Sequence, residues 1–216
     1  MRVLVALDGN SLLRGGESAE AGAQQSNVAA VAEALAGVAE EHEVVIAHDF
    51  DLRLGGMFAL ALRNALPDRD VATVLVDTVV GADSPGILDG PLVLEPQAIV
   101  ELHSLRTLID AGVLVICAGG VGTPITVDHG TMQEVEAAVD KDLTAALLAR
   151  RLDADVLVML TEAASESTSA EVEAARRFVA ATGRRAAIGE LTQAAEMVRG
   201  EAGTQISERP PPMAPG

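Results

Sequence analysis

Short apolar runs alternate along this chain with longer segments in which apolar residues recur at helical spacing. The apolar runs predict six strands, at Arg2 to Leu7, Glu43 to Ala47, Val71 to Val76, Val113 to Cys117, Asp155 to Leu160 and Arg185 to Ile188. Strands that alternate with helices in this way are typical of a largely parallel sheet covered on both faces. The pattern therefore predicts an α/β protein, a three-layer αβα sandwich.

Three apolar stripes at helical spacing lie between the predicted strands. The first contains Val28, Val31, Ala32, Leu35 and Val38. The second contains Ile99, Leu102, Leu105, Leu108 and Ile109, and Gly112 ends that helix. The third begins near Asp140 and contains Leu143, Leu147 and Leu148. Each stripe would pack one helix face against the sheet.

Length and composition favour one folded unit. A chain of 216 residues with 49% hydrophobic residues can bury a large core, so we expect a single domain over residues 1–206. The chain has no Trp or Tyr and three Phe, so Ala, Val, Leu and Ile must build that core. Residues 207–216 are rich in proline and predict a disordered tail.

Charge and hydropathy exclude several classes of partner. A net charge of −17 argues against nucleic-acid binding, which needs a clustered basic surface. No apolar run reaches the roughly 18 residues of a membrane span. Cys117 has no second cysteine for a disulfide, and the amino end is predicted to be a first strand instead of a cleaved leader. These features favour a cytoplasmic protein.

Glycine-rich segments follow three of the apolar runs. They are Asp8-Gly9-Asn10-Ser11, Gly55-Gly56 and Gly119-Gly120-Val121-Gly122-Thr123. Glycine lets backbone N–H groups approach an anion closely, and ligands of open α/β sheets bind where such loops gather. Each segment alone is also compatible with a plain strand-to-helix turn.

Lys141 is the one lysine of the chain, whose other fourteen basic residues are arginines. It lies between Asp140 and Asp142. One lysine kept among arginines suggests a site that needs a compact ammonium with three donors instead of a planar guanidinium, and phosphate chemistry is one such need. The alternative is a solvated lysine at a helix start.

Several motifs in order resemble the carbamate kinases of the amino-acid kinase family. The segment from Val3 to Leu12 is similar to the family's opening Val-Ala-Leu-Gly-Gly-Asn-Ala-Leu, and the segment from Val115 to Pro124 to its second glycine loop. Ala138-Val139-Asp140-Lys141-Asp142-Leu143 matches its lysine motif. Further matches follow at Val172-Glu173-Ala174-Ala175, Arg177-Phe178-Val179, Thr182-Gly183-Arg184, Ala187-Ile188-Gly189 and Gly200-Glu201-Ala202-Gly203-Thr204.

The resemblance implies phosphoryl exchange between ATP and carbamate, giving ADP and carbamoyl phosphate, with Mg²⁺. It implies a homodimer and a place in arginine or purine-derived carbamoyl phosphate metabolism. By the same resemblance, Gly9, Asn10, Gly119, Gly120 and Gly122 would hold carbamate and the transferred phosphoryl group, which Lys141 would neutralise. Asp142 would orient neighbouring groups or the metal, and Thr161 and Glu162 would lie toward the nucleotide.

The chain departs from the family pattern where the chemistry is expected. Asp8 replaces the first glycine of the opening pair, and the family's His-Gly-Asn-Gly-Pro-Gln loop appears as His48-Asp49-Phe50-Asp51-Leu52-Arg53. Glu171 aligns with a family lysine, and the lysine of the protruding subdomain has no counterpart in this shortened chain. Each lost cation removes several kcal/mol of charge stabilisation. We therefore expect weakened or lost kinase activity.

Four alternatives remain open. Arg14 or Arg53 would replace the lost lysines. His48, Asp49 and Asp51 would form a new metal cluster. The chain would be an inactive pseudokinase that binds a nucleotide or anion, or an assembly subunit. The irregular stretch from Gly81 to Pro96 would be a lid, a hairpin, the remnant of an insertion or an ordinary surface loop.

Overall fold

The computed structural model describes residues 1–7, 21–81, 93–161 and 169–208. The strands are β1 (Arg2–Leu7), β2 (Glu43–His48), β3 (Val71–Val80), β4 (Val93–Leu94), β5 (Pro96–Ile99), β6 (Leu114–Asp128), β7 (Thr131–Glu134), β8 (Ala138–Val139), β9 (Val156–Thr161), β10 (Arg185–Glu190) and β11 (Thr204–Ile206). The helices are α1 (Ala21–Glu41), α2 (Leu52–Ala65), α3 (Leu102–Asp110), α4 (Lys141–Arg151), α5 (Ser169–Thr182) and α6 (Ala194–Arg199), with a 3-10 turn at Leu191–Gln193.

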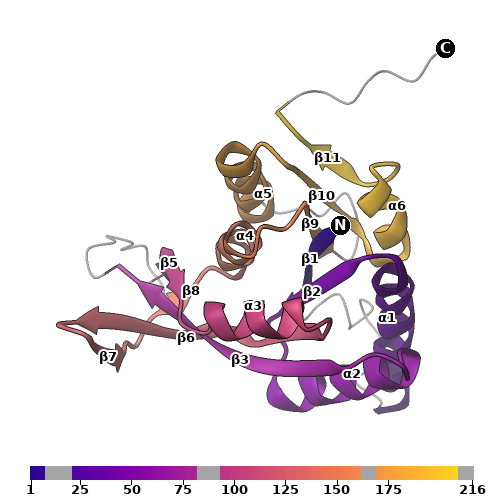
Figure 1. Cartoon of the computed structure of the whole chain (residues 1–216), viewed down its shortest axis with the longest axis horizontal. Coiled ribbons are helices and arrows are strands. Elements are labelled where there is room, and N and C mark those ends of the chain that lie inside the picture. The colour runs from indigo at the N-terminus through magenta and orange to yellow at the C-terminus, as the bar shows by residue number, and fades with distance from the viewer. Residues whose placement is uncertain (8–20, 82–92, 162–168, 209–216) are drawn as a thin grey trace.

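A twisted, largely parallel sheet forms the centre of the molecule (Figure 1). Its strand order is β11-β10-β9-β1-β2-β6-β3-β5, and β1 pairs in parallel with β2 on one side and β9 on the other. The outer strands β11 and β5 are antiparallel to their neighbours. All six predicted strands are present, and their parallel pairing confirms the predicted α/β fold.

Helices cover both faces of this sheet, which explains why its inner strands are continuously apolar. Val3, Val5 and Leu7 of β1 join the core under α1, α2 and α6. Leu4 and Ala6, which point the other way, join the core under α3, α4 and α5. One hydrophobic core therefore lies on each face of the sheet, between the sheet and the helices that cover that face.

The prediction of a glycine loop at Gly55-Gly56 is wrong, because these residues belong to helix α2. Both glycines lie inside this helix, which begins where the side chain of Asp51 accepts a hydrogen bond from the backbone of Leu54 at 2.8 Å. A Cβ on Gly55 would come within 3.0 Å of Cε1 of His48. The glycine therefore permits close packing of the helix on β2 instead of forming an anion-binding turn.

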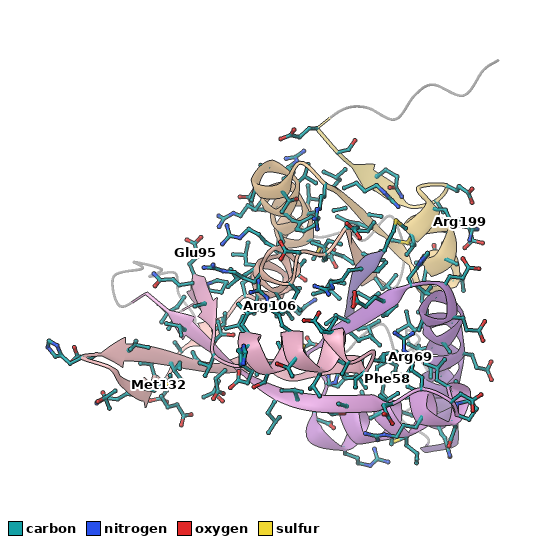
Figure 2. The ribbon with its side chains drawn as sticks, viewed as in Figure 1. Phe58, Arg69, Glu95, Arg106, Met132 and Arg199 are labelled. Atoms are coloured by element: carbon teal, nitrogen blue, oxygen red, sulfur yellow. The ribbon has the colours of Figure 1, made fainter. Side chains whose placement is uncertain are left out.

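An arm built from β3, β6 and β7 extends beyond the helices (Figure 1). β6 and β7 form a hairpin whose turn, at His129 and Gly130, has positive φ angles of 46° and 83°. Met132, on β7 of this arm, is 57% exposed (Figure 2). Within the described segments, no helix is long and apolar enough to cross a lipid bilayer.

Candidate functional site

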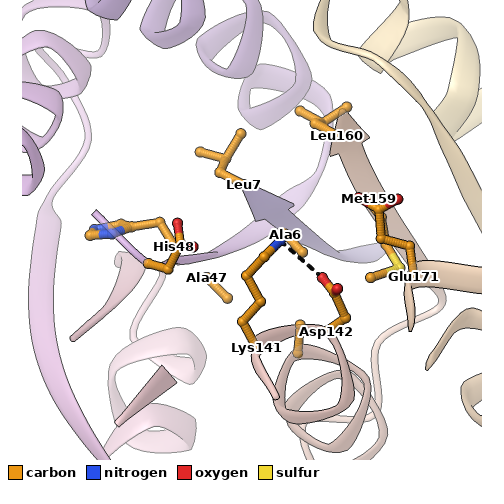
Figure 3. A pocket seen from close by; sticks show the side chains of 11 residues that line it. Ala6, Leu7, Ala47, His48, Lys141, Asp142, Met159, Leu160 and Glu171 are labelled. Carbon is orange, nitrogen blue, oxygen red and sulfur yellow. Dashed lines mark hydrogen bonds and ion pairs between the residues drawn. The ribbon is translucent and has the colours of Figure 1, made fainter. Parts of the chain in front are cut away.

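A pocket lies where the carboxyl ends of β1, β2 and β9 meet the first turns of α4 and α5 (Figure 3). Parallel strands end at one edge of a sheet, and this edge is where ligands of α/β proteins bind. About 290 Å³ of space not filled by atoms lies between its lining residues, and part of this space is open solvent. Its described lining is Ala6, Leu7, Ala47, His48, Asp49, Lys141, Asp142, Ala145, Met159, Leu160 and Glu171.

Lys141 enters this pocket because α4 begins at it. The side chain of Asp140 caps the helix by accepting hydrogen bonds from the backbone of Asp142 at 2.9 Å and of Leu143 at 2.8 Å. The ammonium of Lys141 then lies 3.2 Å from Oδ1 of Asp142, as the dashed line in Figure 3 shows. The motif thus places a cation at the edge of the sheet, pointing toward the end of β1.

Asp142 is buried, with 6% of its surface exposed. Burial raises the pKa of its carboxyl group from 3.8 to about 6, against the opposing attraction of Lys141. Asp140 and Glu171 add repulsion that also raises this pKa. Glu171 lies in the first turn of α5 and is 4% exposed. The described lining contains three acidic residues, Asp49, Asp142 and Glu171, and one lysine, Lys141.

His48 borders the pocket, but its ring turns away from Lys141 (Figure 3). The imidazole stacks on Phe50 at a centroid distance of 4.3 Å and meets the edge of Phe58. Its Nδ1 accepts a hydrogen bond from the backbone of Phe50 at 3.1 Å, while Nε2 is buried without a hydrogen-bond partner among the described residues. Burial lowers the pKa of His48 from 6.5 to about 4, so the ring is neutral.

The hypothesis of a metal cluster at His48, Asp49 and Asp51 is wrong for these residues. Nδ1 of His48 is engaged by the Phe50 backbone, and the carboxylate of Asp51 caps α2. Across the described residues, no group of three or more His, Cys, Asp and Glu side chains could hold a metal ion.

The structure brings together only some of the predicted site residues. Lys141 and Asp142 share the pocket, and Thr161 is buried at the end of β9. Gly9, Asn10 and Glu162 lie outside the described residues.

The predicted loop at Gly119, Gly120 and Gly122 is instead part of the long strand β6. Leu75 of β3 pairs with Ala118, and Asp77 pairs with Thr123, so residues 119–122 bulge out of register with β3. Glycine suits such an irregularity because it tolerates unusual backbone angles. Gly119, Gly120 and Gly122 therefore form an irregular part of β6 and not a separate loop after it.

Arg53 does not line the pocket. Its guanidinium donates a hydrogen bond to Gln24 of α1 at 3.1 Å on an exposed surface. This position does not support the hypothesis that Arg53 replaces a lost lysine. Arg14 lies outside the described residues, as does most of the stretch from Gly81 to Pro96.

Sequence reasoning missed the pocket wall formed by Met159 and Ala145. The twofold alternation of a strand places Met159 on the same face of β9 as Thr161, so that pattern could have identified it. Glu171 was recognised as a charge reversal, but its burial in this pocket depends on how α5 packs beside α4.

Comparison with known proteins identifies several relatives. The model of the amino acid kinase family matches residues 53–165. A carbamate kinase of Rhizobium meliloti is 32% identical over 302 aligned positions, which cover 96% of this chain and 93% of the relative. A carbamate kinase of Haemophilus influenzae is 29% identical over 307 positions, which cover 97% of each chain. These alignments are longer than the 216 residues of this chain, which confirms that it is shortened.

A solved structure extends the likeness to the fold. The carbamate kinase of Giardia lamblia bound to AMP-PNP superposes with a TM-score of 0.85 and 24% sequence identity, over 96% of this chain and 98% of the other. The order of elements is therefore preserved across almost the whole chain.

Proposed function

Because the chain belongs to the amino acid kinase family and, within it, to the carbamate kinases, we propose that it is a phosphotransferase of weakened activity. It would transfer the γ-phosphoryl group of ATP to carbamate, giving ADP and carbamoyl phosphate. The observation that supports this proposal is the ammonium of Lys141 at the carboxyl edge of the sheet, 3.2 Å from Asp142. Support for a nucleotide ligand comes from the relative bound to AMP-PNP.

In this reaction a carbamate oxygen forms a bond to the γ-phosphorus, and the bond from that phosphorus to the β–γ bridging oxygen breaks. ADP leaves with the electron pair of the broken bond. Such transfer depends mostly on aligning the reactants and stabilising the charge of the moving group. Lys141 would supply positive charge to the transferred phosphoryl group, and the salt bridge to Asp142 would hold the ammonium in place.

The proposed Mg²⁺ would reach this site with the nucleotide. Mg²⁺ prefers oxygen ligands and is commonly held by one or two carboxylates together with substrate phosphates. The described residues offer no three-ligand cluster, so the phosphates would supply most of its ligands, while the carboxylate of Asp142 would face it. A bound Mg²⁺ would neutralise part of the phosphate charge.

The weakened rate follows from the charges in the pocket. The described lining of the pocket has one ammonium, that of Lys141, and three acidic residues, Asp49, Asp142 and Glu171. Removing one well-placed charge-stabilising group lowers the rate of an enzyme by about 10²- to 10³-fold. A site with a single lysine and buried acids should therefore transfer phosphate far more slowly than a typical kinase.

A second candidate is a pseudokinase that binds a nucleotide or anion, or acts as an assembly subunit, without turnover. The observation that favours it is the burial of both Asp142 and Glu171 at the one lysine of the chain. In this case the pocket would retain recognition but would lack enough positive charge for the transition state.

Formation of ATP from ADP, Mg²⁺ and carbamoyl phosphate tests the proposal directly. We expect slow turnover by the unaltered protein and at least a 100-fold loss in Lys141→Ala. Arg150→Ala is the matched control because it removes one positive charge from the exposed far end of the same helix.

Two results would contradict the proposal. Turnover at the roughly 1 to 100 s⁻¹ of ordinary kinases would refute the weakened rate. Equal activity in Lys141→Ala and the unaltered protein would refute the site. Calorimetric binding of Mg-ADP that requires Lys141, without any turnover, would favour the second candidate.

A further inference from the structure

Glu171 is a buried acid in a pocket that, under the proposed function, must accept phosphate. Its residue is 4% exposed in the first turn of α5, and its side chain lines the same space as Lys141 and Asp142 (Figure 3). Its negative charge adds to the effect of burial in raising the pKa of the Asp142 carboxyl group. Lys141, which pairs with Asp142 at 3.2 Å, is the one lysine of the chain.

The position of Glu171 has a consequence for any anionic ligand. A phosphate that approaches Lys141 enters a pocket lined by the buried residues Asp142 and Glu171, and their negative charges repel it. The carboxylate of Asp142 already pairs with the ammonium of Lys141 at 3.2 Å. A ligand whose charge is reduced by a divalent cation meets less repulsion than a bare anion does.

We propose that Glu171 is a specificity-determining residue whose carboxylate competes with ligand phosphate for the positive charge of Lys141. The pocket then selects the metal complex of a nucleoside diphosphate or triphosphate over metal-free phosphates. This inference rests on the proposed function, because it concerns the ligands of the same site. Glu171 would thus discriminate between phosphate groups that carry a bound divalent cation and phosphate groups that do not.

Glu171→Gln tests this role, and Glu173→Gln is its matched control. Both variants remove one negative charge from the same helix, but the side chain of Glu173 is 53% exposed and pairs with Arg177. A charge change at the surface is screened within about 10 Å at moderate ionic strength. An effect specific to Glu171 therefore reports on the pocket and not on the net charge of the protein.

Binding is measured by calorimetric titration with Mg-ADP, and with metal-free ADP and pyrophosphate in the presence of a chelator. We expect Glu171→Gln to bind the two metal-free ligands at least tenfold more tightly than the unaltered protein does. Its gain for Mg-ADP should be smaller, and Glu173→Gln should stay within twofold of the unaltered protein. The ratio of the affinity for Mg-ADP to the affinity for metal-free ADP should therefore fall in Glu171→Gln and stay unchanged in Glu173→Gln.

Combining Glu171→Gln with Lys141→Ala separates competition for Lys141 from general repulsion. Competition requires that the gain disappear once the ammonium is removed, so the two substitutions should be strongly non-additive. Persistence of the full gain in the double variant would overturn the inference. Glu171→Ala provides a second variant if the glutamine variant does not fold, as judged by circular dichroism.

The remaining outcomes distinguish this inference from the proposed function. If Lys141→Ala weakens binding while Glu171→Gln leaves it unchanged, the proposed function stands and the inference fails. Weaker Mg-ADP binding by Glu171→Gln also overturns the inference, because it would make the carboxylate a favourable contact. If no folded variant binds any of the ligands, both proposals fail.

Discussion

Replacing Asp142 with asparagine should stabilise this protein at neutral and alkaline pH. The pKa of the buried carboxyl group is about 6 in the folded protein, compared with an ordinary value of 3.8. One pKa unit corresponds to about 1.4 kcal/mol, so full ionisation of this group costs the folded state about 3 kcal/mol. This figure already includes the opposing attraction of Lys141, because the pKa reflects both effects.

The direction of the pH dependence follows from where the proton is held. Between about pH 4 and pH 6, the folded protein retains the proton on Asp142 while the unfolded chain has lost it. The free energy of unfolding therefore falls as the pH rises through this window, and it stays lower above it. The neutral side chain of asparagine has almost the same shape and removes this dependence.

Urea unfolding followed by far-UV circular dichroism measures the effect, since the chain has no Trp or Tyr for fluorescence. The stability advantage of Asp142→Asn should be about 1.5 kcal/mol at pH 5 and about 3 kcal/mol at pH 8. If Asp142→Asn is less stable than the unaltered protein at pH 8, the attraction of Lys141 outweighs burial and this reasoning is refuted.

Three further substitutions test packing and backbone geometry in different parts of the fold. The pKa of the buried His48 imidazole is low, so protonation favours the unfolded chain and the protein should lose up to about 3 kcal/mol of stability between pH 6.5 and pH 4. His48→Asn should not show this loss, as urea unfolding across the same pH range would measure. Gly203→Ala should destabilise by at least about 2 kcal/mol, because φ is 68° and the new Cβ would lie 2.7 Å from the carbonyl oxygen of Ile188; an unchanged urea midpoint would refute this. Gly37→Ala, in open space within α1, should stabilise by about 0.5 to 1 kcal/mol in the same measurement, and a loss would contradict the helix geometry.

The inner strands were predictable because both of their faces are buried. Arg2 to Leu7 was predicted with the bounds that β1 has, and the other five predicted strands differ from the structure mainly in where they end. By contrast, β7 was missed because its sequence, Thr-Met-Gln-Glu, carries no alternating apolar pattern and all four residues are exposed. Its strand conformation comes from pairing with β6 across a tight turn.

The site was predictable only where a local motif fixes a side chain. Asp140 caps α4 and thereby places Lys141 and Asp142, so that three-residue segment contained most of the information. Gly55 was misleading because close packing against His48 and a ligand-binding loop both favour glycine, while Gly56 is simply tolerated in open space within the helix. The burial of Glu171 depends on contacts between two helices and cannot be read from either helix alone.

The central place of β1 has a consequence for how the chain folds. Val3 pairs with Val44 on one side and with Val156 on the other. During synthesis, β1 and β2 can pair early, but the edge that receives β9 stays open until a much later part of the chain emerges from the ribosome. Contacts between such distant residues slow folding and leave an unpaired strand edge exposed to aggregation. The pocket, which needs the ends of β1, β2 and β9 together, must therefore assemble late, and chaperone dependence is the expected cost of this topology.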